Sequence, residues 1–313
     1  MFRPLRLLAW IVSIYLLFCA AVGVFLADVT VHPYRRPLPA GAEAEIQKIA
    51  SGRNAQLADV EIDAQDHAAL RAWFIRPPRG NGDAVILLHG LGDNRLGTVG
   101  YAQILLAHGY GVLMPDARAH GMSGGELPTY GLVERDDIRR WFEWLDHTTH
   151  ARCIYGVGES MGAAQLLQSL SAEPNFCAVV AESSFSTFRE IAYDRMGQRV
   201  GSGPWVGRTL LRPVVEVALL FARIRYHLDL TQVSPEDAVA HSRVPVFLIH
   251  EIVDSNISLG HSLRIQSRSP NVILWKVPGA DHCGAISVAP QEFEQRIIAW
   301  FDIHNSPVAQ SSE

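Results

Sequence analysis

The chain opens with one long apolar segment and then alternates short apolar runs with amphipathic ones. Residues 7–27 contain no charged side chain, and Arg3 and Arg6 precede them. A helix of about 21 residues is long enough to cross a hydrocarbon core about 30 Å thick, because an α-helix rises about 1.5 Å per residue. We therefore expect an N-terminal membrane anchor over residues 1–30. A cleaved signal peptide is the alternative, but the apolar run is longer than a usual signal core and its small residues are poorly placed.

The charges around this segment predict its orientation. Arg3 and Arg6 favour a cytoplasmic N-terminus, so we expect a single-pass anchor with the catalytic domain on the non-cytoplasmic side. Arg35 and Arg36 follow the segment and weaken the asymmetry. Residues 31–50 are rich in Pro and Gly and are interpreted as a linker to a domain over residues 51–313.

The pattern beyond the linker predicts a mostly parallel sheet with helices on both faces. Short runs that are nearly all apolar are typical of strands covered on both sides, and 3.6-residue apolar repeats between them predict helices. The expected strands are residues 57–62, 69–75, 84–88, 111–114, 153–157, 177–181, 244–249 and 272–277. The alternation pauses over residues 185–242, and because an unstructured loop of that length is improbable, we expect a helical cap there.

Composition and charge exclude several classes of protein. The chain of 313 residues is 48% hydrophobic and 19% charged with a net charge of −5, which argues against general disorder and against nucleic-acid binding. Four cysteines do not make a disulfide framework in a chain of this size, and Cys153 and Cys177 are interpreted as small buried thiols. No metal-ligand spacing or phosphate-binding loop occurs, so we expect neither metal nor cofactor.

The strongest local motif is Gly158-Glu159-Ser160-Met161-Gly162, between a predicted strand and a predicted helix. Such a tight turn exposes the serine hydroxyl and requires small residues on both sides. A second copy, Gly121-Met122-Ser123-Gly124-Gly125, has no helix behind it. We therefore expect Ser160 to be a nucleophile and Ser123 to be a loop residue.

A second glycine-rich turn, His89-Gly90-Leu91-Gly92-Asp93, directly follows the predicted strand 84–88. There the backbone can approach a reacting carbonyl group, and the N–H groups of Leu91 and Met161 would form an oxyanion hole. The alternative is a plain turn at a strand exit. His89 is interpreted as structural.

A nucleophilic serine needs a base and a carboxylate that orients the base. Asp254 and His282 each follow a predicted strand, at the sheet edge where Ser160 also lies. Asp281 is disfavoured as the carboxylate because it adjoins His282 in sequence. His250 and His261 flank Asp254, but neither follows the last strand in a glycine-rich turn as His282 does.

With these motifs the chain resembles the α/β-hydrolase superfamily, in the broad group of serine aminopeptidase-like and membrane-anchored serine hydrolases. The matching motifs run from about Val85 to Phe301 and include the loop Asp116-Ala117-Arg118-Ala119-His120-Gly121. The resemblance implies an α/β-hydrolase fold and a triad of Ser160, Asp254 and His282. In one place the chain departs from this group, because Glu251 stands where Gly usually follows the histidine. A carboxylate there would tilt Asp254 or add charge beside the site.

These observations predict a serine hydrolase that cleaves a carboxylic ester through an acyl-enzyme on Ser160. We expect the partner to be a small-molecule or lipid acyl substrate, and the anchor and the apolar stretch 215–221 of the cap are the reasons to include an acyl lipid. A peptidase or amidase of the same fold is one alternative, and an acidic cluster in the cap would favour it. A non-catalytic membrane-anchored binding module is the other, and the loss of a triad residue would favour that one.

Overall fold

The computed structural model describes residues 2–306. The chain divides into two compact units. The first, here called the helical unit, joins the N-terminal segment up to Pro33 with Thr187–Val233; the second, the sheet unit, joins Tyr34–Ser186 with the chain from Ser234 onward. Each unit is described by itself.

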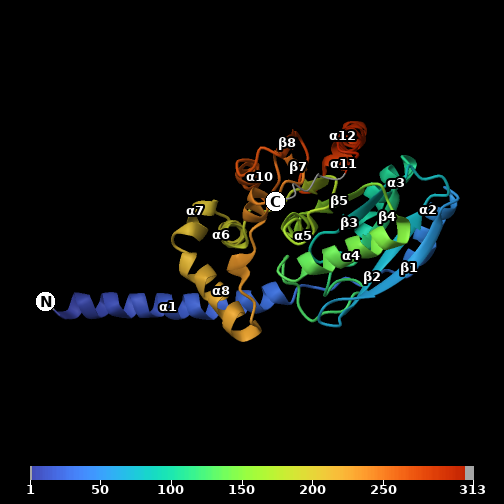
Figure 1. Cartoon of the computed structure of the whole chain (residues 1–313). Coiled ribbons are helices and arrows are strands. Elements are labelled where there is room, and N and C mark those ends of the chain that lie inside the picture. Colours follow the sequence, from blue (N-terminus) through green and yellow to red (C-terminus); the bar gives the residue numbers. More distant parts are fainter. Residues whose placement is uncertain (1, 307–313) are drawn as a thin grey trace, which may run out of the picture. The chain divides into compact units, whose positions relative to one another are not determined.

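The sheet unit contains an eight-stranded sheet with the order β1-β2-β4-β3-β5-β6-β7-β8 (Figure 1). β1 pairs antiparallel with β2 and β2 antiparallel with β4, whereas all the other neighbours are parallel. The sheet therefore confirms the predicted mostly parallel architecture. The strands are β1 (Gln56–Asp63), β2 (Ala69–Arg76), β3 (Ala84–Leu88), β4 (Gly111–Pro115), β5 (Ile154–Glu159), β6 (Val179–Glu182), β7 (Val246–Glu251) and β8 (Val272–Val277).

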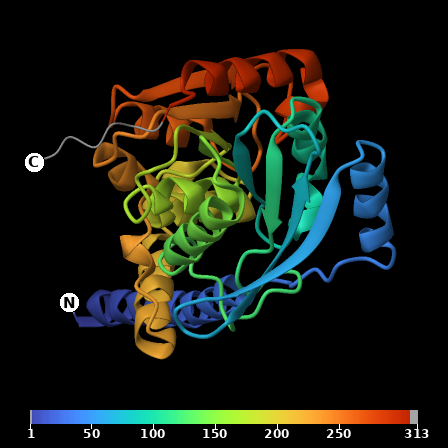
Figure 2. The ribbon, with the colours of Figure 1, turned by 45° about the vertical axis from the view of Figure 1, so that its right-hand side comes forward.

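Helices lie on both faces of this sheet (Figure 2), and a hydrophobic core lies on each face. In β3, Val85 and Leu87 belong to one core and Ile86 and Leu88 to the other, as the alternation of side chains along a strand requires. The first core includes side chains of α2 (Ala42–Ser51), α3 (Val99–Ala107) and α12 (Pro290–Ile303). The second includes side chains of α4 (Glu134–Thr149), α5 (Met161–Ser169), α9 (Pro235–Ala240) and α10 (Leu259–Gln266). Two short helices, η1 (Arg95–Thr98) and α11 (Ala285–Val288), complete the sheet unit.

Two features of the sheet unit differ from the sequence expectations. Helix α2 occupies part of the predicted linker, and its Ile46 is fully buried, so this stretch belongs to the core rather than to a spacer. Cys153 and Cys177 form a disulfide and are not free thiols. They lie just before β5 and β6, which are parallel neighbours, so the strand pairing brings the two side chains together.

The helical unit consists of α1 (Phe2–Val31), α6 (Phe188–Arg199), α7 (Pro204–Arg208), α8 (Arg212–Tyr226) and the short η2 (Leu230–Gln232). The long helix α1 confirms the predicted N-terminal apolar helix, and residues Pro4–Val31 are long and apolar enough to cross a membrane by length and composition. The predicted cap, residues 185–242, contains α6, α7, α8, η2 and α9.

Candidate active site

Ser160 lies on the tight turn between β5 and α5. Its backbone has φ 51° and ψ −113°, an uncommon conformation for a residue other than glycine. A Cβ atom added at Gly158 would lie 2.7 Å from the backbone of Gly162, and one added at Gly162 would lie 2.4 Å from the carbonyl oxygen of Leu88. Both glycines are therefore required by the close approach of backbone to backbone.

Asp254 and His282 come to the same edge of the sheet, because they follow β7 and β8, which run parallel to β5. His282 Nε2 lies 2.8 Å from the Ser160 hydroxyl, and His282 Nδ1 lies 2.8 Å from Asp254 Oδ2. The structure thus brings together the three side chains singled out in the sequence. With Nδ1 protonated, the imidazole donates to Asp254 and its Nε2 is free to accept the serine proton.

The environment of Asp254 favours its ionised form. Burial raises the pKa of this carboxyl group, but hydrogen bonds from His282 and from the backbone N–H groups of Ile257 and Asn256 outweigh burial and hold the pKa below its ordinary value. The Asp254 side chain has no exposed surface, whereas that of His282 is 16% exposed. The neighbouring Asp281 has other partners: it accepts hydrogen bonds from the Ser255 backbone and hydroxyl and from the backbone N–H of His282.

The other candidates from the sequence have structural partners. The Ser123 hydroxyl is buried, accepts the backbone N–H of Arg71 and donates to the carbonyl oxygen of Asp116. His89 is buried and bonds the Gly90 carbonyl oxygen and the Ala117 N–H. His250 bonds the Ser262 hydroxyl and the Ile257 carbonyl oxygen, and His261 bonds Ser186.

The glycine-rich turn after β3 lies beside the serine. A Cβ atom added at Gly90 would lie 3.5 Å from the Ser160 Cβ. Leu91, the next residue, is 47% exposed, and Met161 is the first residue of α5. The backbone of this turn and the start of α5 therefore flank the Ser160 side chain, as an oxyanion hole made by the N–H groups of Leu91 and Met161 requires.

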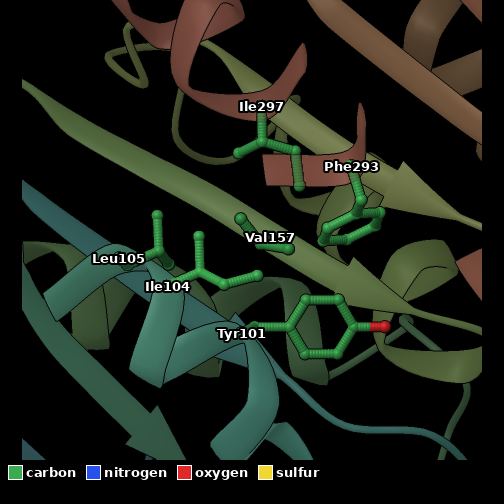
Figure 3. Close-up of a pocket in the computed structure, with 6 residues that line it drawn as sticks. All are labelled: Tyr101, Ile104, Leu105, Val157, Phe293 and Ile297. Atoms are coloured by element: carbon green, nitrogen blue, oxygen red, sulfur yellow. The ribbon is translucent and has the colours of Figure 1, made fainter. Parts of the chain in front are cut away.

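Three buried or half-buried glutamates, Glu159, Glu182 and Glu251, end the neighbouring strands β5, β6 and β7, and the first two bond Tyr101. The Tyr101 hydroxyl bonds Glu159 at 3.0 Å and Glu182 at 2.8 Å. Its ring lines a small cavity of about 10 Å³ in the core, and Figure 3 shows its hydroxyl pointing away from Ile104 and Leu105. Burial raises the pKa of Tyr101 well above its ordinary value, and the charges of Glu182 and Glu159 raise it further.

This glutamate cluster contacts two of the loops that carry the site. Glu159 accepts the N–H of Gly90 at 3.3 Å, and both Glu182 and Glu251 accept the N–H of Ala285, three residues after His282. Burial raises the pKa of Glu182 well above its usual value, and so does its bond with Glu251. Sequence reasoning noticed Glu251 only as a departure from a family pattern. The missed signal was an acidic residue at the end of each of three neighbouring apolar strands.

The same cluster affects Cys283, the residue after His282. Burial raises the pKa of its thiol well above the ordinary value, and the charges of Glu182, Glu159 and Glu251 act in the same direction. A neutral thiol is a poor nucleophile. Across the described residues 2–306, no group of three or more His, Cys, Asp or Glu side chains is arranged to hold a metal ion.

Known proteins resemble the chain in sequence and in structure. The sequence model of the alpha/beta hydrolase family matches residues 85–296. An uncharacterized protein of Bacillus subtilis, YqkD, is 29% identical over 201 residues, which are 63% of this chain and 64%, slightly less than two thirds, of YqkD.

Among solved structures, the esterase Pf2001 of Pyrococcus furiosus is 25% identical with a TM-score of 0.68, over 87% of this chain and 99% of the esterase. The crystal structure of a membrane phospholipase A has a TM-score of 0.61 at 15% identity, over 97% of this chain and 99% of that one, which is a likeness of fold. The family match begins at Val85, near the start of β3, ends within the last helix, α12, and includes Ser160, Asp254 and His282. The chain therefore belongs to the α/β-hydrolase family and is a hydrolase.

Proposed function

We propose that the protein is a serine esterase in which Ser160 is the nucleophile, His282 the general base and Asp254 the residue that orients the base. The observation that carries the proposal is the continuous chain of hydrogen bonds from the Ser160 hydroxyl through the imidazole to the Asp254 carboxylate, 2.8 Å at each step. The likeness to the Pyrococcus esterase, at 25% identity, supports an ester as the substrate.

The reaction follows from this geometry. Ser160 Oγ attacks the ester carbonyl carbon while His282 Nε2 takes the serine proton, and Asp254 stabilises the imidazolium that forms. The N–H groups of Leu91 and Met161 stabilise the negative charge on the carbonyl oxygen. When the tetrahedral intermediate collapses, His282 returns the proton to the departing alcohol and the acyl group stays on Ser160. Water then repeats the sequence, and the carboxylic acid leaves.

We further propose that the substrate is an acyl lipid and that α1 anchors the protein with its catalytic domain outside the cytoplasm. The apolar span Pro4–Val31 supports membrane attachment. The disulfide Cys153–Cys177 supports the location, because disulfides persist in oxidising compartments and are rare in the cytosol. A C-terminal reporter that is active only in the cytoplasm tests the orientation, and a strong signal from it would contradict this location.

The two serines that share the Gly-x-Ser-x-Gly pattern provide a matched test. We expect Ser160→Ala to lower kcat on p-nitrophenyl acyl esters by about 10⁶-fold, because the covalent step is lost. Ser123→Ala removes a buried hydroxyl that bonds the Arg71 and Asp116 backbone, so it should lower stability but leave the kcat of the folded protein near that of the wild type. Full activity in a folded Ser160→Ala variant would contradict the proposal.

A further inference from the structure

Helix α8 packs along the C-terminal half of α1, within the helical unit (Figure 1). Near one end of the contact, the Tyr15 hydroxyl donates to the carbonyl oxygen of Leu210, just before α8 begins. In the middle, a Cβ atom added at Gly23 would lie 2.7 Å from the carbonyl oxygen of Val214, so this glycine allows close approach of the two helices. At the other end, the Tyr226 hydroxyl donates to Asp28 at 2.5 Å.

The part of α1 that precedes its contact with α8 is too short to cross a membrane by itself. Before Tyr15 the apolar span comprises residues 4–14, which extend about 16 Å, whereas the hydrocarbon core of a bilayer is about 30 Å thick. The uncovered part is therefore about half of the length needed. If α1 crosses the membrane, part of the stretch from Tyr15 to Asp28 lies in the hydrocarbon region, and α8 lies there beside it.

The surface of α8 and of the turn before it carries exposed apolar side chains, as a position in the hydrocarbon region requires. Leu220 is 55% exposed and Ile224 is 66% exposed, one turn apart on the helix. Leu220 also lies one turn after Val217, whose side chain is at the close contact with Gly23, so the exposed strip adjoins the contact with α1. Before α8, Trp205 is 66% and Leu210 is 61% exposed.

Three charged side chains of α8 have ion-pair partners inside the helical unit, and Arg225 lies over the Tyr226 ring, 5.3 Å from its centroid; these partners lower the cost of moving the charges out of water. Glu216 lies 3.6 Å from Arg189 and 3.9 Å from Arg212, and Arg223 lies 3.6 Å from Asp229. Arg212 and Arg223 are themselves more than half exposed, and their long side chains can extend to lipid phosphates while the helix stays at the acyl chains.

We infer that Trp205, Leu210, Leu220 and Ile224 form a bilayer-facing surface that contacts phospholipid acyl chains beside the C-terminal half of α1. The anchor then inserts together with part of the cap, and it is not a free tether. This membrane contact does not depend on the reaction proposed at Ser160.

Labelling of one introduced cysteine at a time, in the full chain bound to lipid vesicles, tests this surface. The vesicles consist of phosphatidylcholine and phosphatidylglycerol, with or without nitroxide-labelled phosphatidylcholine as a quencher of fluorescence. Leu220→Cys and Ile224→Cys report on α8, Leu17→Cys reports on the exposed part of α1, and Ile303→Cys, 72% exposed at the end of α12, is the matched control. Each carries an environment-sensitive fluorophore. The unsubstituted chain, labelled in parallel, measures the background from Cys19 and Cys283.

We expect quenching at positions 220 and 224 as strong as at position 17, with a blue-shifted emission, and no quenching at position 303. Quenching at position 17 alone would overturn the inference, because α1 would then insert without α8. Quenching at none of the four positions would overturn it as well. Because the substituted side chains are exposed, we expect the wild-type fold, checked by circular dichroism, and the hydrolase assay of the same samples is a separate readout.

Discussion

Replacing Glu251 by glutamine should make the protein more resistant to unfolding at alkaline pH. The Ala285 nitrogen lies 3.2 Å from Glu182 Oε1 and 3.3 Å from Glu251 Oε1. Since both oxygens lie so close to the Ala285 nitrogen, the two oxygens are at most about 6.5 Å apart. Two unit charges at that distance repel by about 2.5 kcal/mol at an effective dielectric constant near 20. Both side chains are buried, so water and salt screen little of this repulsion.

The raised pKa of Glu182 determines how the stability of the folded protein changes with pH. A carboxyl group whose pKa is raised by folding stabilises the folded protein fully below its unfolded pKa, near 4.5, and this stabilisation is lost as pH rises through the folded pKa. In Glu251→Gln the amide oxygen still accepts the Ala285 N–H, the amide N–H₂ takes the place of the oxygen that accepts the Ser183 hydroxyl, and the neutral side chain removes the negative charge beside Glu182. The loss of stability on the alkaline side should therefore be smaller than in the wild type.

Urea unfolding from about pH 5 to about pH 9 measures this effect. We expect the advantage of Glu251→Gln over the wild type to grow with pH, towards about 2.5 kcal/mol. Glu292→Gln is the control, because this carboxyl group is half exposed beside Arg296 and should give a difference that is nearly independent of pH. A difference between Glu251→Gln and the wild type that stays constant with pH would refute the reasoning.

Three further variants test other parts of the structure. Asp254→Asn should lower kcat on esters by about 10⁴-fold with little change in KM, because the imidazole loses the carboxylate that orients it; steady-state kinetics that show less than a tenfold loss would contradict this role. Gly162→Ala should prevent the native turn, since the added methyl would lie 2.4 Å from the Leu88 carbonyl oxygen; a wild-type melting temperature would show that the backbone can move aside. Replacing both Cys153 and Cys177 by Ala should lower the free energy of unfolding by up to about 3.5 kcal/mol, the chain-entropy value for a loop that joins residues 24 apart. Denaturant unfolding measures it, and an unchanged midpoint would contradict the stabilising role of the disulfide.

The catalytic candidates were accessible from sequence because each follows a recognisable strand. Ser160, Asp254 and His282 come after β5, β7 and β8, and parallel strands bring their carboxyl ends to one edge of a sheet. Local pattern was therefore enough to predict that the three side chains share one edge. The glycines around Ser160 were predictable for the same reason, since the strand-to-helix turn is a local feature.

The parts that sequence reasoning missed depend on which elements are neighbours. Cys153 meets Cys177 only because β5 and β6 are adjacent and parallel, and Glu182 meets Glu251 only because β6 pairs with β7. The contact between α1 and α8 joins segments about 200 residues apart, as in the bond between Tyr15 and Leu210. The hydrophobic pattern of a strand or helix does not show which other strand or helix lies beside it, because the pattern is a property of one segment alone.

Labelling with a fluorophosphonate probe, followed by mass spectrometry of the adduct, tests the central claim most directly. The probe reacts with a serine only when a neighbouring base activates its hydroxyl, so it does not require knowledge of the natural ester. The account predicts one adduct, on Ser160, which is lost in Ser160→Ala and retained in Ser123→Ala. A folded wild-type protein with no adduct, or with an adduct that survives in Ser160→Ala, would contradict the claim.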